Sequence, residues 1–215
     1  MASTNNQPFD LVYVEPVSTT IRNVLLIDNA VEEAQLFANA VNDSTFPIIY
    51  SSTSTKTELL ALLKTTFTTI DRIGLVFHSN TTGTVTTFLD GEPFFTNEKF
   101  SDSPYGENVD FLVSVLKEFS VKNIDSLACD TLNYPNWVNY YTLLTKETGV
   151  VVGASNDKTG NIKYGGDWIM ESTSQDIELV YFGKSIKYYS YLLVEDKVGN
   201  GVMYYNIGEK KIVLK

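Results

Sequence analysis

The chain contains one histidine and one cysteine, and both stand where a buried strand is predicted to end. His78 follows the apolar run RIGLVF, and Cys129 follows IDSLA. A cysteine becomes a nucleophile when its thiol loses a proton, and a free thiol, with a pKa of about 8.5, is mostly protonated at neutral pH. A nearby imidazole can accept that proton during attack and return one to the leaving group. These residue types therefore point to nucleophilic thiol chemistry, provided that the fold brings the two side chains together.

Each of these residues also has a simpler structural interpretation. A lone buried cysteine commonly acts as a small apolar core residue, and a lone histidine is commonly a solvated or hydrogen-bonded side chain. The coincidence of two unique residues at equivalent strand ends favours a joint role. The sequence leaves both interpretations open.

Short apolar runs alternate with amphipathic helical patterns through most of the chain. Parallel strands need long crossover connections, so this alternation predicts an α/β fold in which a mainly parallel sheet carries helices on both faces. The expected strands are 24–28, 46–50, 72–77, 124–128 and 150–155, and the expected helices are 29–41, 55–67, 107–119 and 136–149.

Two regions depart from the alternation. Residues 83–95 alternate in polarity around Asp90-Gly91, a pair typical of a hairpin turn. From residue 177 onward, strand-like runs joined by glycine-containing turns predict an antiparallel β appendage. We therefore divide the chain into an extended arm (1–21), an α/β domain (22–185) and a C-terminal β appendage (186–215).

Ligands of open α/β sheets bind beyond the carboxyl ends of the strands. If the strands that end at His78 and Cys129 are neighbours, about 5 Å apart, the two side chains lie side by side at that edge. Asp28 ends an earlier strand and Asp130 follows Cys129, so both are expected on the same rim. As carboxylates they could select Lys or Arg in a substrate. Solvated or helix-capping carboxylates are the alternative.

The order of these elements resembles that of the caspase-like cysteine peptidases, a group that includes caspases, legumains, gingipains and separases. Caspases carry their histidine about 50 residues before an Ala-Cys pair, as His78 precedes Ala128-Cys129. The chain is more closely similar to a bacterial domain of unknown function, DUF4347, over about residues 22–185. The similarity rests on Val24–Asp28, Phe77-His78-Ser79, Ala128-Cys129-Asp130 and Gly165-Gly166-Asp167-Trp168.

The resemblance implies a caspase-like three-layer sandwich and a role for each matching residue. Cys129 would be the nucleophile and His78 the general base and acid. The backbone N–H groups of Cys129 and of the residues just after His78 would hold the oxyanion, which makes Ser79 a substrate-binding position. Ser79 and Ala128 replace the glycines of the family pattern, and their Cβ atoms could narrow the approach of a substrate. Asp167 and Trp168 are expected to be structural, as an Asx-type turn and an apolar anchor.

Composition limits the partners. The 215 residues carry a formal net charge of −10, which argues against nucleic acids and anionic membranes and leaves peptide or protein substrates open. A single cysteine cannot form an internal disulfide, and neither a signal peptide nor an apolar run of about 18 residues is recognisable. We expect a cytoplasmic or virion location.

Dinucleotide-binding and phosphate-binding motifs are missing, and one histidine with one cysteine makes a zinc site improbable unless carboxylates complete it. We expect no metal and no cofactor.

Two functional hypotheses follow. The first is a cysteine peptidase with a His-Cys dyad that cleaves after basic residues. The second is an inactive structural or interaction protein, for example a virion or surface-assembly component, that keeps the fold. The tyrosine-rich C-terminal strands could then mediate self-association.

Overall fold

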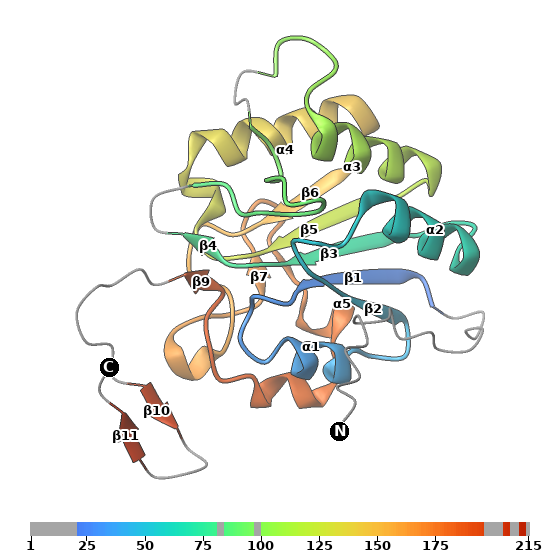
Figure 1. Ribbon diagram of the computed structural model, residues 1–215. Helices are drawn as coiled ribbons and strands as arrows, with labels where there is room; N and C mark the ends of the chain where they lie inside the picture. Colours follow the sequence, from blue (N-terminus) through green and yellow to red (C-terminus); the bar gives the residue numbers. More distant parts are fainter. Residues whose placement is uncertain (1–20, 81–83, 97–99, 196–203, 207–210, 214–215) are drawn as a thin grey trace, which may run out of the picture.

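The computed structural model of the protein describes residues 21–80, 84–96, 100–195, 204–206 and 211–213 (Figure 1). Nearly all of the expected N-terminal arm lies outside these residues. Among the helices that are described, none is both long enough and apolar enough to cross a bilayer.

A five-stranded sheet forms the centre of the molecule, and all its neighbouring strands are parallel. The order across the sheet is β2-β1-β3-β5-β6. The parallel α/β sheet predicted from the sequence is thereby confirmed. Its strands are β1 (Asn23–Asp28), β2 (Thr45–Tyr50), β3 (Arg72–Val76), β5 (Asn123–Leu127) and β6 (Val151–Ala154).

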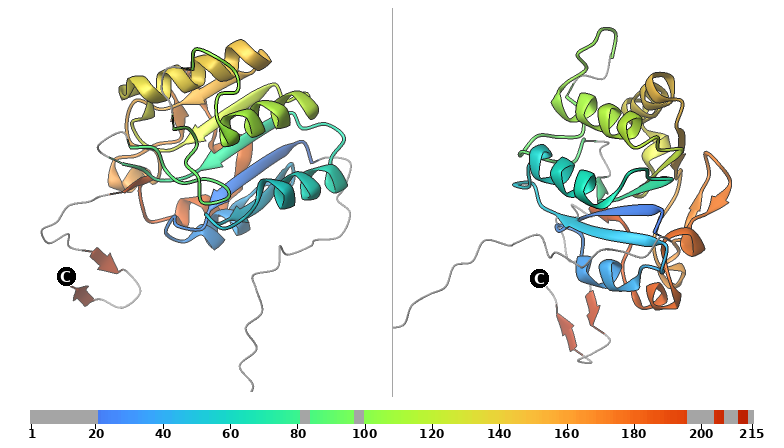
Figure 2. Two further views of the ribbon diagram at one scale, coloured as in Figure 1. Left: turned by 45° about the horizontal axis from the view of Figure 1, so that its top comes forward. Right: turned by 90° about the vertical axis from the view of Figure 1, so that its right-hand side faces the viewer.

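Helices cover both faces of the sheet, and each face has its own buried core (Figure 2). Successive side chains of a strand point to opposite faces. Along β1, for example, Val24 and Leu26 join one core, whereas Leu25 and Ile27 join the other. The first core packs against α2 (Lys56–Thr66), α3 (Glu107–Glu118) and α4 (Pro135–Thr148). The second packs against α1 (Ala34–Ala40), α5 (Glu178–Tyr181) and the 3₁₀ helix η3 (Lys184–Tyr188).

Several local signals of the sequence act as expected. The side chain of Thr55 caps α2 and accepts a hydrogen bond from the backbone N–H of Glu58, and the Glu58 carboxylate accepts one from the backbone N–H of Thr55. Gly149 ends α4 in the left-handed conformation. Asp90 and Gly91, with φ of 57° and 72°, form the expected turn between Thr87 and Pro93, which pair as an antiparallel bridge.

Two predicted elements differ from the structure. The helix expected over 29–41 begins only at Ala34, because Glu33 has a φ of 54° that no helix accommodates. The strand expected over 177–183 is the short helix α5 instead, and most of the run 186–194 forms η3 and an irregular segment. Strand pairing in that run is limited to an isolated antiparallel bridge of Leu192 with Gly160 and to the start of β9 (Val194–Glu195), which is parallel to β4 (Ser79–Asn80).

Residues 186–193 contribute three fully buried side chains to the second core: Ile186, Tyr189 and Leu193. Beyond them, β10 (Tyr204–Asn206) and β11 (Lys211–Val213) form the small antiparallel C-terminal hairpin. The antiparallel part of the predicted appendage is confirmed by this hairpin. Residues 186–193, by contrast, pack into the second core.

Candidate functional site

β3 and β5 are adjacent and parallel, so the residues that follow them meet at one edge of the sheet. Val76 pairs with Leu127 in the register, and the backbone N–H of Phe77 donates to the Leu127 carbonyl at 3.3 Å. His78 and Cys129 come immediately after this point. The Cys129 side chain belongs to the second core, whereas Phe77 belongs to the first. Alternation along the chain then turns His78 toward the same face as Cys129.

The His78 imidazole is held by a carboxylate. Its Nε2 lies 2.6 Å from Oε2 of Glu32, and the histidine side chain is 12 % exposed. The hydrogen bond from His78 lowers the pKa of Glu32, with burial acting in the opposite sense. A carboxylate in this position fixes the orientation of the ring, as it does for catalytic and metal-binding histidines. The sequence did not indicate this contact, because Glu32 falls within the helix predicted over 29–41.

Asp28 lies near this pair. It is 5 % exposed and accepts a hydrogen bond from the backbone of Ala30 at 2.9 Å. Burial raises the pKa of the Asp28 carboxyl, and the Ala30 hydrogen bond and the charge of His78 oppose that rise only in part. Asp28 therefore lies close enough to His78 to interact with its charge, and it ends β1 at the edge of the sheet expected from the sequence.

The Cys129 thiol is fully buried. Its Sγ accepts a hydrogen bond from the backbone N–H of Thr159 at 3.2 Å and lies 3.5 Å from the Thr159 carbonyl. Burial raises the pKa of the thiol to about 12, helped by the charges of Asp130 and Asp157, and the backbone of Thr159 and of Leu193 lowers it in part. Cys129 is therefore a neutral thiol at physiological pH. Within the described part of the chain, no hydrogen bond joins it to His78.

A segment from the C-terminal region lies across both residues, and we call residues 191–195 the strap. Its β9 part runs beside β4, directly after His78 (Figure 1). On the other side, Leu192 forms an antiparallel bridge with Gly160, and the backbone N–H of Asn161 donates to Tyr191 at 3.2 Å. The strap thus connects the loop after β3 to the loop after β6.

The Leu193 carbonyl, in the middle of the strap, accepts two backbone hydrogen bonds. It accepts hydrogen bonds from the backbone N–H of Cys129 at 3.1 Å and of Ser79 at 3.3 Å. The N–H of Leu193 donates to the Thr159 carbonyl at 2.9 Å. Two converging backbone N–H groups beside a nucleophile are the arrangement that stabilises an oxyanion in acyl transfer. These two belong to Cys129 and to the residue after His78.

The glycine-rich loop that carries the Gly-Gly-Asp-Trp sequence provides room for the strap. A Cβ on Gly160 would lie 2.7 Å from the Tyr191 carbonyl oxygen, and one on Gly166 would lie 2.7 Å from a methyl group of Leu192. Asp167 accepts a hydrogen bond from the backbone of Ile169 at 2.9 Å, which is the expected Asx-type turn. Trp168 is the expected apolar anchor and packs against aromatic rings of the second core.

The remaining predicted residues lie around the same edge. Ser79 is 3 % exposed and contributes its backbone N–H, while its buried hydroxyl makes no hydrogen bond within the described residues. Asp130 is half-buried, with a φ of 58°, and its carboxylate accepts a hydrogen bond from Asn133 at 3.2 Å. The sequence did not indicate Leu193, because residues 186–194 have the pattern of an edge strand.

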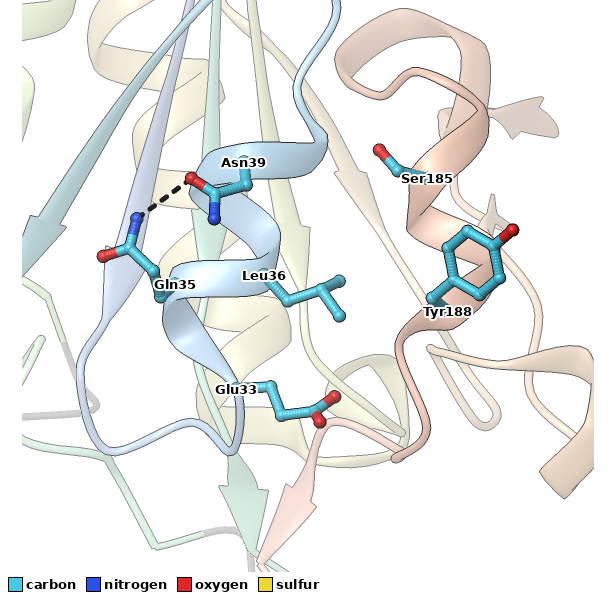
Figure 3. A pocket seen from close by; sticks show the side chains of 6 residues that line it. All are labelled: Glu33, Gln35, Leu36, Asn39, Ser185 and Tyr188. Atoms are coloured by element: carbon cyan, nitrogen blue, oxygen red, sulfur yellow. Dashed lines mark hydrogen bonds between the residues drawn. The ribbon is translucent and has the colours of Figure 1, made fainter. Parts of the chain in front are cut away.

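Two other features lie outside this edge. A shallow depression of about 440 Å³ between α1 and η3 is lined by Leu36 and Tyr188 among others, and it contains neither His78 nor Cys129 (Figure 3). Asp157, Asp167 and Glu171 place carboxylate oxygens within 4.8 Å of one another and could hold a cation. Each of these carboxylates already accepts a hydrogen bond: Asp157 and Asp167 within their own turns, and Glu171 from the backbone N–H of Asn156. These bonds give the cluster a structural role.

The sequence of the chain matches one known protein family over most of its length. Residues 24–193 match the family described as Domain of unknown function (DUF4347), and the chain belongs to that family. The match ends at Leu193, the residue whose carbonyl lies between the two amides. Comparisons with curated proteins and with solved structures gave no match.

Proposed function

We propose that the protein is a cysteine peptidase of the caspase-like kind, with Cys129 as the nucleophile and His78 as the general base and acid. One observation carries the proposal: the backbone N–H groups of Ser79 and Cys129 bind the same carbonyl oxygen, at 3.3 and 3.1 Å. In this proposal, the scissile carbonyl of a substrate would take the place of this oxygen. The amides belong to residues at the ends of adjacent parallel strands, the arrangement implied by the caspase-like resemblance.

The roles of the surrounding residues follow from their contacts. Glu32 binds Nε2 of His78, so Nδ1 is the ring nitrogen left to exchange a proton; it is buried and makes no hydrogen bond within the described residues. The two amides would stabilise the negative charge that develops on the oxygen when Sγ attacks. Such stabilisation is worth about 10²–10³ in rate for one donor.

The structure corresponds to a closed state of this site. The thiol is inaccessible and neutral, and the strap lies where a peptide substrate would bind. Activity toward another chain therefore requires that the strap leave. The labelling experiment below tests the preference for Lys or Arg expected from Asp28 and Asp130 against a preference for an apolar residue at the scissile position.

The same closure favours a second candidate function. A buried thiol, a filled groove and the Cβ atoms of Ser79 and Ala128 are compatible with an interaction protein that has lost activity. Such a protein could serve in a virion or a surface assembly and self-associate through its C-terminal strands. It needs no cofactor in either case, and the two candidates differ in whether His78 influences the thiol.

Labelling with peptidyl electrophiles separates the two candidates. The full chain is incubated with acyloxymethyl ketones that carry Leu, Lys or Arg beside the reactive group, and adducts at Cys129 are measured by mass spectrometry. We expect labelling that falls by about 100-fold in His78→Ala, the typical contribution of a general acid–base group. Unchanged thermal unfolding of the variant is the control for folding. Equal, slow labelling of both chains, and of the same pair carrying Gly160→Ala to displace the strap, would support the interaction protein and contradict the peptidase.

A further inference from the structure

We infer that the strap is an intramolecular substrate: Cys129 cleaves the Leu193–Val194 peptide bond of its own chain and releases residues 194–215. The inference rests on the proposed peptidase function and names its first substrate. It also commits to an apolar residue at the scissile position. Three independent features of the strap support it.

The first feature is the alignment of the scissile peptide unit. The Leu193 carbonyl binds the amides of Ser79 and Cys129, and the Leu193 N–H binds the Thr159 carbonyl. Sγ of Cys129 contacts the backbone of Thr159 as well, at 3.2 Å to its nitrogen. Leu193 and the thiol therefore share the same neighbour, and the leucine is held on both sides of its Cα. An ordered hydrogen-bond frame of this kind is what positions a substrate for attack.

The second feature is a subsite that fits the leucine side chain. Leu193 is fully buried in the second core, which also contains Cys129, Trp168 and Tyr189. An apolar pocket of this kind recognises leucine through burial of its surface, worth about 1.5–3 kcal/mol for such a side chain. A lysine or arginine there would have to bury a charge beside aromatic rings.

The third feature is the direction of the leaving segment. Val194 pairs with Ser79 in the β4–β9 register, so the leaving nitrogen lies on a strand beside the residue that follows His78. The histidine is therefore on the side of the bond where a proton must be delivered. The next residue, Glu195, pairs with Asn80, so β9 keeps the new amine on the histidine side of the cleaved bond.

The reaction balances with water as the only added reactant. Sγ forms a bond to the carbonyl carbon of Leu193 while the thiol proton passes through His78 to the nitrogen of Val194, and the C–N bond breaks. Water then attacks the thioester: its hydroxyl group stays on Leu193 as a carboxylic acid, and its other proton returns to the sulfur. The carboxylic acid then gives its proton to the new amine of Val194, which leaves a carboxylate and an ammonium group. Because the strap is already bound, the first step is intramolecular, and such effective molarities reach about 10⁵–10⁸ M. That advantage compensates for a thiol that is seldom ionised.

The test follows the full chain by intact mass and N-terminal sequencing. Purified protein is incubated from pH 7 to pH 10, and we expect a product that ends at Leu193 and a fragment that begins at Val194. Cys129→Ala and His78→Ala should remain intact. Leu193→Met should still be cut and Leu193→Asp should not. Leu179→Asp, at a leucine that is 82 % exposed, is the matched control and should be cut like the parent chain.

The outcomes distinguish this inference from the proposed function. An intact parent chain whose Cys129 is nevertheless labelled by a peptidyl electrophile in a His78-dependent way overturns self-cleavage and leaves the peptidase standing. An intact chain without such labelling overturns both. Cleavage that persists in Cys129→Ala, or at a different bond, also contradicts the inference. If Leu193→Asp fails to fold, the comparison of the parent with Cys129→Ala decides alone.

Discussion

Replacing Arg72 with methionine should lower the free energy of unfolding by about 3–5 kcal/mol, because it leaves a buried carboxylate without its cation. Nε of Arg72 lies 2.9 Å from Oδ2 of Asp125, and the two side chains are 11 % and 1 % exposed. The Tyr181 hydroxyl donates to the same oxygen at 2.6 Å. This cluster connects β3 and β5 to α5 under the sheet that carries the site.

The loss should depend on pH. Burial raises the pKa of Asp125, and the charge of Arg72 and the Tyr181 hydrogen bond oppose that rise. Without Arg72 the folded-state pKa rises further, so the ionised carboxyl destabilises the fold above its unfolded pKa. The deficit of Arg72→Met should therefore be largest at neutral pH and shrink as the pH falls through the folded-state pKa toward the unfolded one. It should be smallest below about pH 3, where Asp125 is protonated in both states.

Urea unfolding of three chains measures this effect: the parent, Arg72→Met, and Arg72→Met combined with Asp125→Asn. The double variant has no buried charge and should recover part of the lost stability. A loss below about 1 kcal/mol in the single variant, which is the scale of an exposed ion pair, would contradict the role assigned to this cluster.

Replacing Gly160 with alanine should expose the Cys129 thiol and raise its alkylation rate by at least about 100-fold. This factor corresponds to the loss of a local opening free energy of a few kcal/mol, which is at the low end for structured regions. The new Cβ would lie 2.7 Å from the Tyr191 oxygen and 3.1 Å from Cα of Leu192. Both are backbone atoms of the strap, and Gly160 has a φ of 137° that alanine rarely adopts. The strap must therefore move away from the loop.

Iodoacetamide kinetics, followed by mass spectrometry over a range of pH, measure this opening. In the parent chain the thiol pKa is raised to about 12, so the rate should still increase with pH well beyond pH 9. In Gly160→Ala the rate should level off at a lower pH, because the thiol is hydrated and its pKa falls.

Gly165→Ala is the matched control. Gly165 also has a positive φ, 82°, but no atom lies within 4 Å of the added Cβ. It introduces similar backbone strain without touching the strap, and its alkylation should resemble that of the parent. Equal acceleration in both variants would show that strain alone opens the site, and the account of the strap would be wrong.

The sheet and the edge that bears the site could be predicted from local patterns. Strands such as 24–28 and 124–128 are short, continuous apolar runs, and the crossover helices between them require a parallel arrangement. His78 and Cys129 lie at the same edge of the sheet because both follow such strands, which are adjacent and parallel. Backbone amides at strand ends need no particular side chain, so Ser79 can donate its N–H to the Leu193 carbonyl although it replaces the glycine of the family pattern.

The strap could not be predicted, because its position depends on long-range pairing. Residues 186–194 have the alternation of an edge strand, and nothing local specifies that Leu193 should reach the ends of β3 and β5. The contact of Glu32 with His78 was hidden for the same reason. Glu32 comes three residues after Asn29, a spacing typical of the start of a helix. In the structure, the left-handed conformation of Glu33 shifts that start to Ala34.

The central claim is that the amides of Ser79 and Cys129 form the oxyanion site of a thiol nucleophile. The most direct measurement is a crystal structure of Gly160→Ala with a leucyl electrophile bonded to Cys129. The account predicts that the inhibitor oxygen lies about 3 Å from both amide nitrogens, with its leucine in the place of Leu193 and the strap displaced. An adduct whose oxygen points elsewhere, with the Leu193 carbonyl still bound to both amides, would contradict it.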